Sequence, residues 1–145
     1  AFVRYLSNHQ GEIGDLQYAG GLVLRALSMA NAEIFKGLDP EADMIGTTTL
    51  MGGIILELEI DDDDESKQTV PQYGFVYVSI GDCKAYHWSN ITKSFSDITA
   101  SNRTGTLSAS DCGGRLGPHN EGNLPDLRNL ELGFYACNPG DCIMI

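Results

Sequence analysis

The chain has 145 residues, a formal net charge of −11 and a hydrophobic share of 42%, values that suit one globular domain with a sizeable core. Its nine basic residues form no cluster, which argues against nucleic acid or an anionic membrane as a partner, because both are bound by neutralising phosphates. No apolar run approaches the roughly 18–20 residues of a membrane helix. We therefore expect neither nucleic acid nor a membrane among the partners.

Four cysteines occur without a CxxC pair, at Cys83, Cys112, Cys137 and Cys142. An even number permits disulfides, but nothing else indicates a small secreted scaffold. Cys83, Cys137 and Cys142 lie in apolar, strand-like contexts, where a free cysteine behaves as a small buried hydrophobe. Since no charged-then-apolar leader is visible either, we expect reduced thiols and an intracellular location, cytoplasmic or nuclear.

Residues 15–35 have the pattern of one long amphipathic helix. Apolar side chains recur there at three- and four-residue spacing, at Leu16, Ala19, Val23, Leu27, Ala30 and Ile34. Gly37 follows the last of them at the position of a helix C-cap, and Pro40 comes shortly after. Small residues along this segment predict close packing on a sheet.

Residues 48–60 change to a period of two, which predicts a strand. The acidic run at 61–65 and the polar residues that follow predict a loop. We interpret the run as a solvated hairpin tip, because it lacks the glycine and distal glutamate of a calcium loop. Residues 73–80 are rich in aromatic and β-branched residues and predict a second strand.

The next segments predict an antiparallel meander. Gly81-Asp82 suits a type II′ turn that leads directly into a strand at 83–88. A turn at 89–92 then leads into a short strand at 93–98. Residues 99–128 are rich in Ser, Thr, Asn, Gly and Asp and predict a long irregular loop, a kind of segment that is often functional.

Strand character resumes at 130–137 and is followed by Asn138-Pro139-Gly140-Asp141, a sequence that fits a type II turn. Residues 142–145 begin another apolar strand. Because that strand stops after four residues, we expect the chain to be a fragment of a larger domain.

Three landmarks resemble, in order and context, the type 2C metal-dependent protein serine/threonine phosphatase family. Gly46-Thr47-Thr48 opens a long hydrophobic strand; an apolar strand leads to Gly81-Asp82-Cys83-Lys84-Ala85; and Asn138-Pro139-Gly140-Asp141 precedes a further apolar strand. The stretches Gly113-Gly114-Arg115-Leu116-Gly117 and Pro125-Asp126-Leu127-Arg128-Asn129-Leu130 look like the intervening loop of divergent members. The resemblance covers residues 14–145.

This resemblance implies an α+β fold, a four-layer α-β-β-α sandwich of two mainly antiparallel sheets, of which residues 1–145 are the central part. Family members hold two Mn²⁺ or Mg²⁺ ions through carboxylates and waters, and a metal-bridging hydroxide attacks phosphorus. The family's Asp-Gly-His-Gly segment has no counterpart before the helix, and its later aspartates are expected beyond Ile145. We therefore expect no catalytic residue within this chain and no catalysis by the chain alone.

Few site residues can be assigned from the resemblance. Asp82 maps to a metal-associated aspartate, and the alternative is an ordinary turn aspartate. Arg115 and Arg128 are candidates to hold a phosphorylated peptide, although such arginines more often anchor a loop. Gly46, Thr47, Thr48 and Gly81 are interpreted as structural residues of the motifs. His87 is expected to be a half-buried sheet residue rather than a catalytic group.

The sequence thus predicts that the parent protein hydrolyses phosphoserine and phosphothreonine in phosphoproteins with Mn²⁺ or Mg²⁺. The first alternative is a pseudophosphatase or scaffold that binds protein partners, since Gly81-Asp82-Cys83-Lys84 departs from the commoner Gly-Asp-Ser-Arg. The second is an unrelated β-rich binding domain. The substrate's identity and the oligomeric state are not determined by the sequence.

Overall fold

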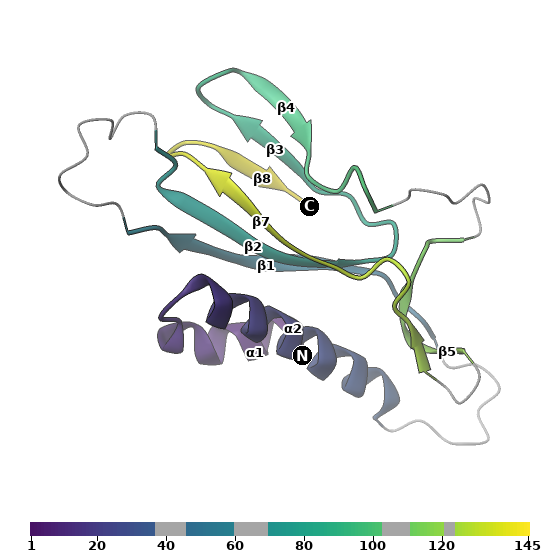
Figure 1. Ribbon diagram of the computed structural model, residues 1–145. Coiled ribbons are helices and arrows are strands. Elements are labelled where there is room, and N and C mark those ends of the chain that lie inside the picture. Colours follow the sequence, from purple (N-terminus) through teal and green to yellow (C-terminus); the bar gives the residue numbers. More distant parts are fainter. Residues whose placement is uncertain (37–45, 60–69, 103–110, 121–123) are drawn as a thin grey trace.

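A computed structural model describes residues 1–36, 46–59, 70–102, 111–120 and 124–145 (Figure 1). Its helical elements are α1 (Phe2–His9), the 3₁₀ turn η1 (Gln10–Glu12) and α2 (Leu16–Phe35). Its strands are β1 (Leu50–Glu57), β2 (Tyr73–Ile80), β3 (Tyr86–Ser89), β4 (Ser94–Asp97), β5 (Arg115–Asn120), β6 (Leu124–Asp126), β7 (Glu131–Cys137) and β8 (Cys142–Met144).

The predicted long helix is confirmed as α2. It begins at Asp15, whose Oδ1 accepts a hydrogen bond from the backbone N–H of Tyr18 at 2.6 Å, the contact of an N-cap. The predicted C-cap Gly37 lies outside the described residues. The sequence did not predict α1, which is only eight residues long and has no side-chain cap. It forms because it buries Leu6 against the rest of the protein.

The first sheet has the order β1-β2-β7 and is antiparallel throughout. Both predicted strands are present, although β1 ends at Glu57; one further backbone bond, from Leu58 N–H to Gln72 O at 2.8 Å, continues the pairing. The acidic run 61–65 and Ile60 lie outside the described residues. Strand β2 is the middle strand and is buried on both faces.

The second sheet has the order β4-β3-β8, and it corrects the predicted hairpin at Gly81-Asp82. Gly81 does have a positive φ of 89°, but β3 begins only at Tyr86 and pairs with β4 and β8 rather than with β2. The chain therefore crosses from one sheet to the other after Gly81. The crossing places β3 and its neighbours over Phe75 and Tyr77, two large β2 side chains that a simple hairpin would leave uncovered.

The type II turn at 138–141 is confirmed in its main features. Gly140 has φ of 84°, and Asp141 N–H donates to Asn138 O at 3.1 Å. This turn also crosses between sheets, because β7 belongs to the first sheet and β8 to the second. The expectation for Cys142 was wrong: it is exposed, while Cys137 is buried, and all four cysteines are free thiols.

The carboxylate of Asp141 fixes this second crossing. It accepts hydrogen bonds from His87 Nε2 at 2.9 Å, from Asn90 N–H at 2.8 Å and from Asn138 N–H at 2.8 Å. Burial alone would raise the pKa of Asp141, but these three hydrogen bonds outweigh it, so that the pKa lies below its ordinary value. His87 is a buried sheet residue, and its imidazole serves this turn.

The prediction that residues 99–128 form one long irregular loop was wrong in part. They include the antiparallel pair β5 and β6. A β-bridge connects this pair to the segment that precedes β1: Thr48 and Leu116 exchange both backbone hydrogen bonds, at 3.1 and 2.8 Å. The sequence did not indicate these strands, because the register between β5 and β6 is irregular and Leu116 is the large apolar side chain that they bury deeply within the described residues.

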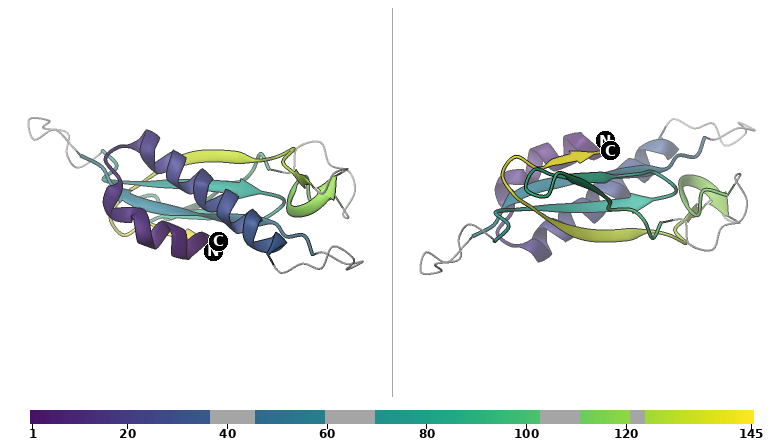
Figure 2. Two further views of the ribbon diagram at one scale, coloured as in Figure 1. Left: turned by 90° about the horizontal axis from the view of Figure 1, so that it is seen from below. Right: turned by 90° about the horizontal axis from the view of Figure 1, so that it is seen from above.

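The described elements form three layers (Figures 1 and 2). Helices α1 and α2 lie side by side on one face of the first sheet, and the second sheet covers the other face. Val76, Val78 and Ile80 of β2 pack toward the helices, whereas Phe75 and Tyr77 pack toward the second sheet. The fold is therefore α+β. Neither described helix combines the length and apolar character that crossing a membrane would require.

Candidate functional site

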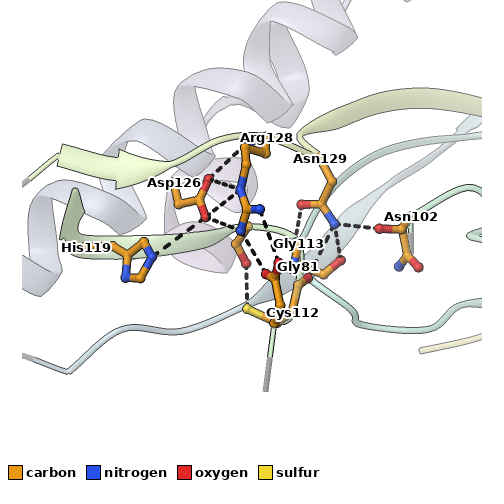
Figure 3. Close-up of polar contacts among 10 residues, drawn as sticks. Gly81, Asn102, Cys112, Gly113, His119, Asp126, Arg128 and Asn129 are labelled. Atoms are coloured by element: carbon orange, nitrogen blue, oxygen red, sulfur yellow. Dashed lines mark hydrogen bonds and ion pairs between the residues drawn. The ribbon is translucent and has the colours of Figure 1, made fainter. Parts of the chain in front are cut away.

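The first two sequence landmarks meet at the end of the sandwich where β2 ends and β7 begins, whereas the third, at 138–141, lies at the opposite end. Four segments lie there together: 46–49, 81–83, 111–117 and 126–129. Each of them contains residues that the sequence analysis singled out, although the segments are separate in the sequence. Figure 3 shows the contacts at the centre of this region.

Gly81 is packed too closely for any side chain. A Cβ atom at this position would lie 2.2 Å from Thr49 Cγ2 and 2.9 Å from Gly114 O. Its positive φ adds a second reason for glycine. Thr49 also accepts a contact from the Cys83 thiol, with Sγ and Oγ1 3.1 Å apart. The strand that follows Gly46-Thr47-Thr48 therefore packs directly on the Gly81-Asp82 turn.

Gly117 joins the first landmark to β5. Its φ is 88°, and a Cβ there would lie 2.8 Å from Gly46 O and 3.4 Å from Thr47 Cα. The Gly117 N–H donates to Asn31 Oδ1 of α2 at 2.8 Å. Gly46 and Thr47 thus line a close backbone approach, and Thr48 makes the bridge to Leu116. These contacts suit the structural interpretation of the motif residues.

The side chain of Asn129 holds the Gly81 turn from the opposite side (Figure 3). Its Oδ1 accepts from Gly81 N–H at 2.9 Å, and its Nδ2 donates to Gly81 O at 2.9 Å. The same Nδ2 donates to Asn102 O at 2.6 Å and lies 3.5 Å from Cys112 O. One carboxamide therefore satisfies both backbone groups of Gly81 and connects the turn to two other segments.

Asn102 continues this arrangement on the other side of Asp82. It is 4% exposed, and its Nδ2 donates to the backbone oxygen of Cys83. The backbone on each side of Asp82 is consequently fixed by an asparagine carboxamide, at Gly81 by Asn129 and at Cys83 by Asn102. The Asn102 Oδ1 atom is buried and has no hydrogen-bond partner among the described residues.

Arg128 is engaged with two carboxylates (Figure 3). Its Nε is 3.0 Å from both carboxylate oxygens of Asp126, and its terminal nitrogens reach Asp111 at 2.8 and 3.2 Å. These hydrogen bonds with Arg128 lower the pKa of Asp126 and of Asp111, and they raise the pKa of Arg128. His119 Nε2 lies 3.9 Å from Asp126. The contacts of Arg128 are those of a residue that anchors a loop.

Arg115 lies at the start of β5, opposite Asp126 in the β5–β6 register. Its positive charge contributes to lowering the pKa of Asp111. Its Nε is buried and has no hydrogen-bond partner within the described part of the chain. Arg115 and Arg128 are therefore brought to the same region as Asp111 and Asp126, and Arg128 is the one whose guanidinium binds both carboxylates.

Asp82 occupies the turn between the two fixed backbone positions and is half-buried. The described residues contain no group of three or more His, Cys, Asp or Glu side chains close enough to hold a metal ion. A single carboxylate is too few for Mn²⁺ or Mg²⁺, which take about six oxygen ligands. The residues described here thus do not fit a complete divalent-metal centre.

The structure adds two site residues to which the sequence analysis gave no role, Asn102 and Asn129. Asn129 stands within the quoted stretch 125–130, and its neighbour Arg128 was the residue considered there. An isolated asparagine carries no pattern that distinguishes a long-range clamp from a loop residue. Only the fold brings it to Gly81, which is 48 residues away.

Comparison with protein-family models, with curated proteins and with solved structures finds no match to the chain.

Proposed function

We propose that this chain is the central part of a type 2C protein serine/threonine phosphatase, a metal-dependent enzyme that hydrolyses phosphoserine and phosphothreonine in proteins. One observation carries the proposal. Gly46-Thr47-Thr48 and Gly81-Asp82 are far apart in the sequence, yet they pack against each other through Thr49 at one end of the sandwich. Motifs that form one catalytic edge in a family are expected to converge in this way.

The layers support the same proposal. The resemblance implies four layers, and three are described. The outer face of the second sheet carries Trp88, Phe95 and Met144, of which Phe95 is 63% exposed and Met144 39% exposed. A face this apolar is normally covered. We propose that a second helical layer, contributed by residues outside this chain, packs on it and completes the sandwich.

The metal ions belong to the proposal, but their ligands are not among the described residues. Asp82 is the one position that the resemblance links to a metal, and it is held in a defined backbone conformation. The remaining ligands must come from elsewhere in the parent protein, so the chain alone is not expected to be active. Arg115 and Arg128 are proposed to approach the phosphorylated peptide from the segments 111–117 and 126–129.

An assay of the complete domain tests this function. A phosphoserine peptide is incubated with the protein and Mn²⁺, and released phosphate is measured with and without a chelator. Turnover that the chelator abolishes supports the proposal, and Asp82→Asn should raise the Mn²⁺ concentration needed for half-maximal turnover more than Asp126→Asn does. No turnover at any Mn²⁺ concentration by a folded domain contradicts the enzymatic claim.

A pseudophosphatase or scaffold is the second candidate, and two contacts favour it. Lys84 Nζ is bound to Asp97 at 2.9 Å and to Thr99 O at 3.3 Å, and Arg128 is bound to two aspartates. Both cations are thus already used in internal contacts rather than presented to a phosphate. A folded complete domain that binds a phosphopeptide without hydrolysing it, with Mn²⁺ present, would support this candidate.

A further inference from the structure

Gly81 lies in the connection between the two sheets, just beyond the last paired residue of β2. Strand β2 ends at Ile80, and β3 begins only at Tyr86. Gly81 is buried, so its N–H and C=O need partners within the protein. The Asn129 side chain provides both, at 2.9 Å each, in place of the backbone partners that a neighbouring strand would supply. The turn therefore depends on a side chain from another segment.

The position of Asn129 is itself fixed on both sides. Arg128 is bound to Asp126 and Asp111, and Leu130 packs against the core beneath α2 while its N–H donates to Leu127 O at 3.1 Å. The space around the carboxamide is also limited, since a Cβ on Gly114 would lie 2.4 Å from Asn129 Oδ1. These contacts fix the orientation in which the Asn129 side chain faces the turn.

Three backbone oxygens converge on the Asn129 amide nitrogen: those of Asn102 at 2.6 Å, Gly81 at 2.9 Å and Cys112 at 3.5 Å. Such a set of carbonyls requires a donor or a positive charge at its centre, because the oxygens repel one another. An oxygen in place of this nitrogen would reverse the interaction. The requirement is for a carboxamide and not merely for a side chain of this size.

We infer that Asn129 is the positioning residue for the Gly81-Asp82-Cys83 turn, and that through it the segments 111–117 and 126–129 influence the backbone conformation at Asp82. A displacement of these segments, for example by a bound peptide, would be transmitted to Gly81, next to Asp82, by the Asn129 carboxamide. The functional meaning of this coupling rests on the proposed phosphatase activity, whereas the coupling itself follows from the contacts.

Native-state hydrogen exchange on the full-length protein containing this domain tests the inference. In Asn129→Ala, the Gly81 N–H loses its acceptor, and we expect its exchange to accelerate by about tenfold or more relative to Val78 N–H in the same sample. Val78 lies in the middle of the first sheet and is fully buried. Asn129→Asp keeps an acceptor for Gly81 N–H, loses both donors, and is expected to shift the Gly81, Asp82 and Cys83 amide resonances.

Asn31→Ala is the matched control. It removes an asparagine side chain of α2 that binds β5 through Gly117 N–H at 2.8 Å, and it is expected to leave the ratio of Gly81 to Val78 exchange unchanged. Equal acceleration of the two amides in Asn129→Ala, or the same change in Asn31→Ala, overturns the inference. So does failure of both Asn129 variants to fold, which would show that Asn129 is needed for the whole fold.

Activity distinguishes this inference from the proposed function. If the domain is a phosphatase, Asn129→Ala should lower kcat/KM for a phosphoserine peptide about tenfold or more, and Asn31→Ala should not. If hydrogen exchange changes as expected but neither protein shows turnover, Asn129 still positions the turn and only the phosphatase proposal fails. Unchanged exchange at Gly81 overturns the inference whatever the activity.

Discussion

Two connections carry the chain from one sheet to the other, and they are built differently. Residues 81–85 connect β2 to β3 at one end of the sandwich, and residues 138–141 connect β7 to β8 at the opposite end. Each contains a glycine with positive φ, Gly81 at 89° and Gly140 at 84°. The first is held by the neutral carboxamides of Asn129 and Asn102, and the second by the carboxylate of Asp141.

The difference lies in where the fixing group comes from. Asp141 belongs to its own turn and binds Asn138 N–H within it, while its other two partners, His87 and Asn90, are distant in the sequence. Asn129 is 48 residues from Gly81 and is carried by a loop that has further contacts of its own. One crossing therefore contains its own fixing side chain, whereas the other is fixed by side chains from separate segments. The motif aspartate Asp82 lies in the second of these.

Removal of each fixing group gives the largest expected effect. Asp141→Ala leaves Asn90 N–H, Asn138 N–H and His87 without their acceptor, and we expect a loss of about 3–4 kcal/mol in the free energy of unfolding. Asn129→Ala removes fewer strong contacts and should cost about 2 kcal/mol. Urea unfolding followed by circular dichroism measures both. A cost for Asn129→Ala greater than that for Asp141→Ala would reverse the proposed order.

Alanine substitutions at the two glycines should cost different amounts of stability, because the space around the two positions differs. At Gly81 a Cβ would strike Thr49 and a backbone oxygen, so Gly81→Ala is expected to cost about 2–3 kcal/mol. At Gly140 the nearest atom is the flexible end of Asn90, at 2.9 Å, and Gly140→Ala should cost about 1 kcal/mol. Equal melting temperatures for the two variants would show that packing around Gly81 relaxes easily.

Acid should affect the two crossings differently. The pKa of Asp141 is lower in the folded protein than in the unfolded chain, where it is about 3.9. Its contribution is therefore present above about pH 4 and is lost as pH falls through the folded pKa. The stability difference between wild type and Asp141→Asn should shrink between about pH 5 and pH 3. The difference for Asn129→Ala should stay constant over that range, since a carboxamide does not titrate.

A substitution at Phe95, on the outer face of the second sheet, shows how little the free energy of unfolding should change away from the two crossings. Phe95 is 63% exposed and belongs to neither crossing, so Phe95→Ser should change the free energy of unfolding by only about 0.5 kcal/mol or less. The same substitution should reduce self-association of the chain, because it removes apolar area from the uncovered face. Sedimentation velocity at several concentrations measures this, and Ile91→Ser in the exposed turn serves as a control away from that face.

Much of the framework was predictable because it is encoded locally. The three- and four-residue period of α2 and the alternation in β1 and β2 reflect which side chains each element buries, and the element types were therefore predicted correctly. The turn at 138–141 was predicted because proline and glycine impose its dihedral angles. These signals require only the residues of the element itself.

The errors arose where distant residues decide the structure. A positive φ at Gly81 fits both a hairpin and a crossing, and the choice depends on whether Phe75 and Tyr77 are covered by another sheet. Strands β5 and β6 lack apolar alternation. They are held to the rest of the protein by the bridge at Thr48 and by side-chain contacts, neither of which leaves a periodic pattern in the sequence. The role of Asn129 depends on the same tertiary arrangement. Local patterns thus identified the motif residues but not the group that holds them.

Strand β2 has a consequence for how the protein unfolds. Its even-numbered residues Val76, Val78 and Ile80 belong to the cluster beneath the helices, and its odd-numbered residues Phe75 and Tyr77 belong to the cluster between the sheets. A shift of one residue in its pairing would exchange the two sets and disrupt both clusters at once. Both clusters therefore contain side chains of the same strand, and neither can unfold without the other. Thermal unfolding should be a single cooperative transition in which calorimetric and van't Hoff enthalpies agree.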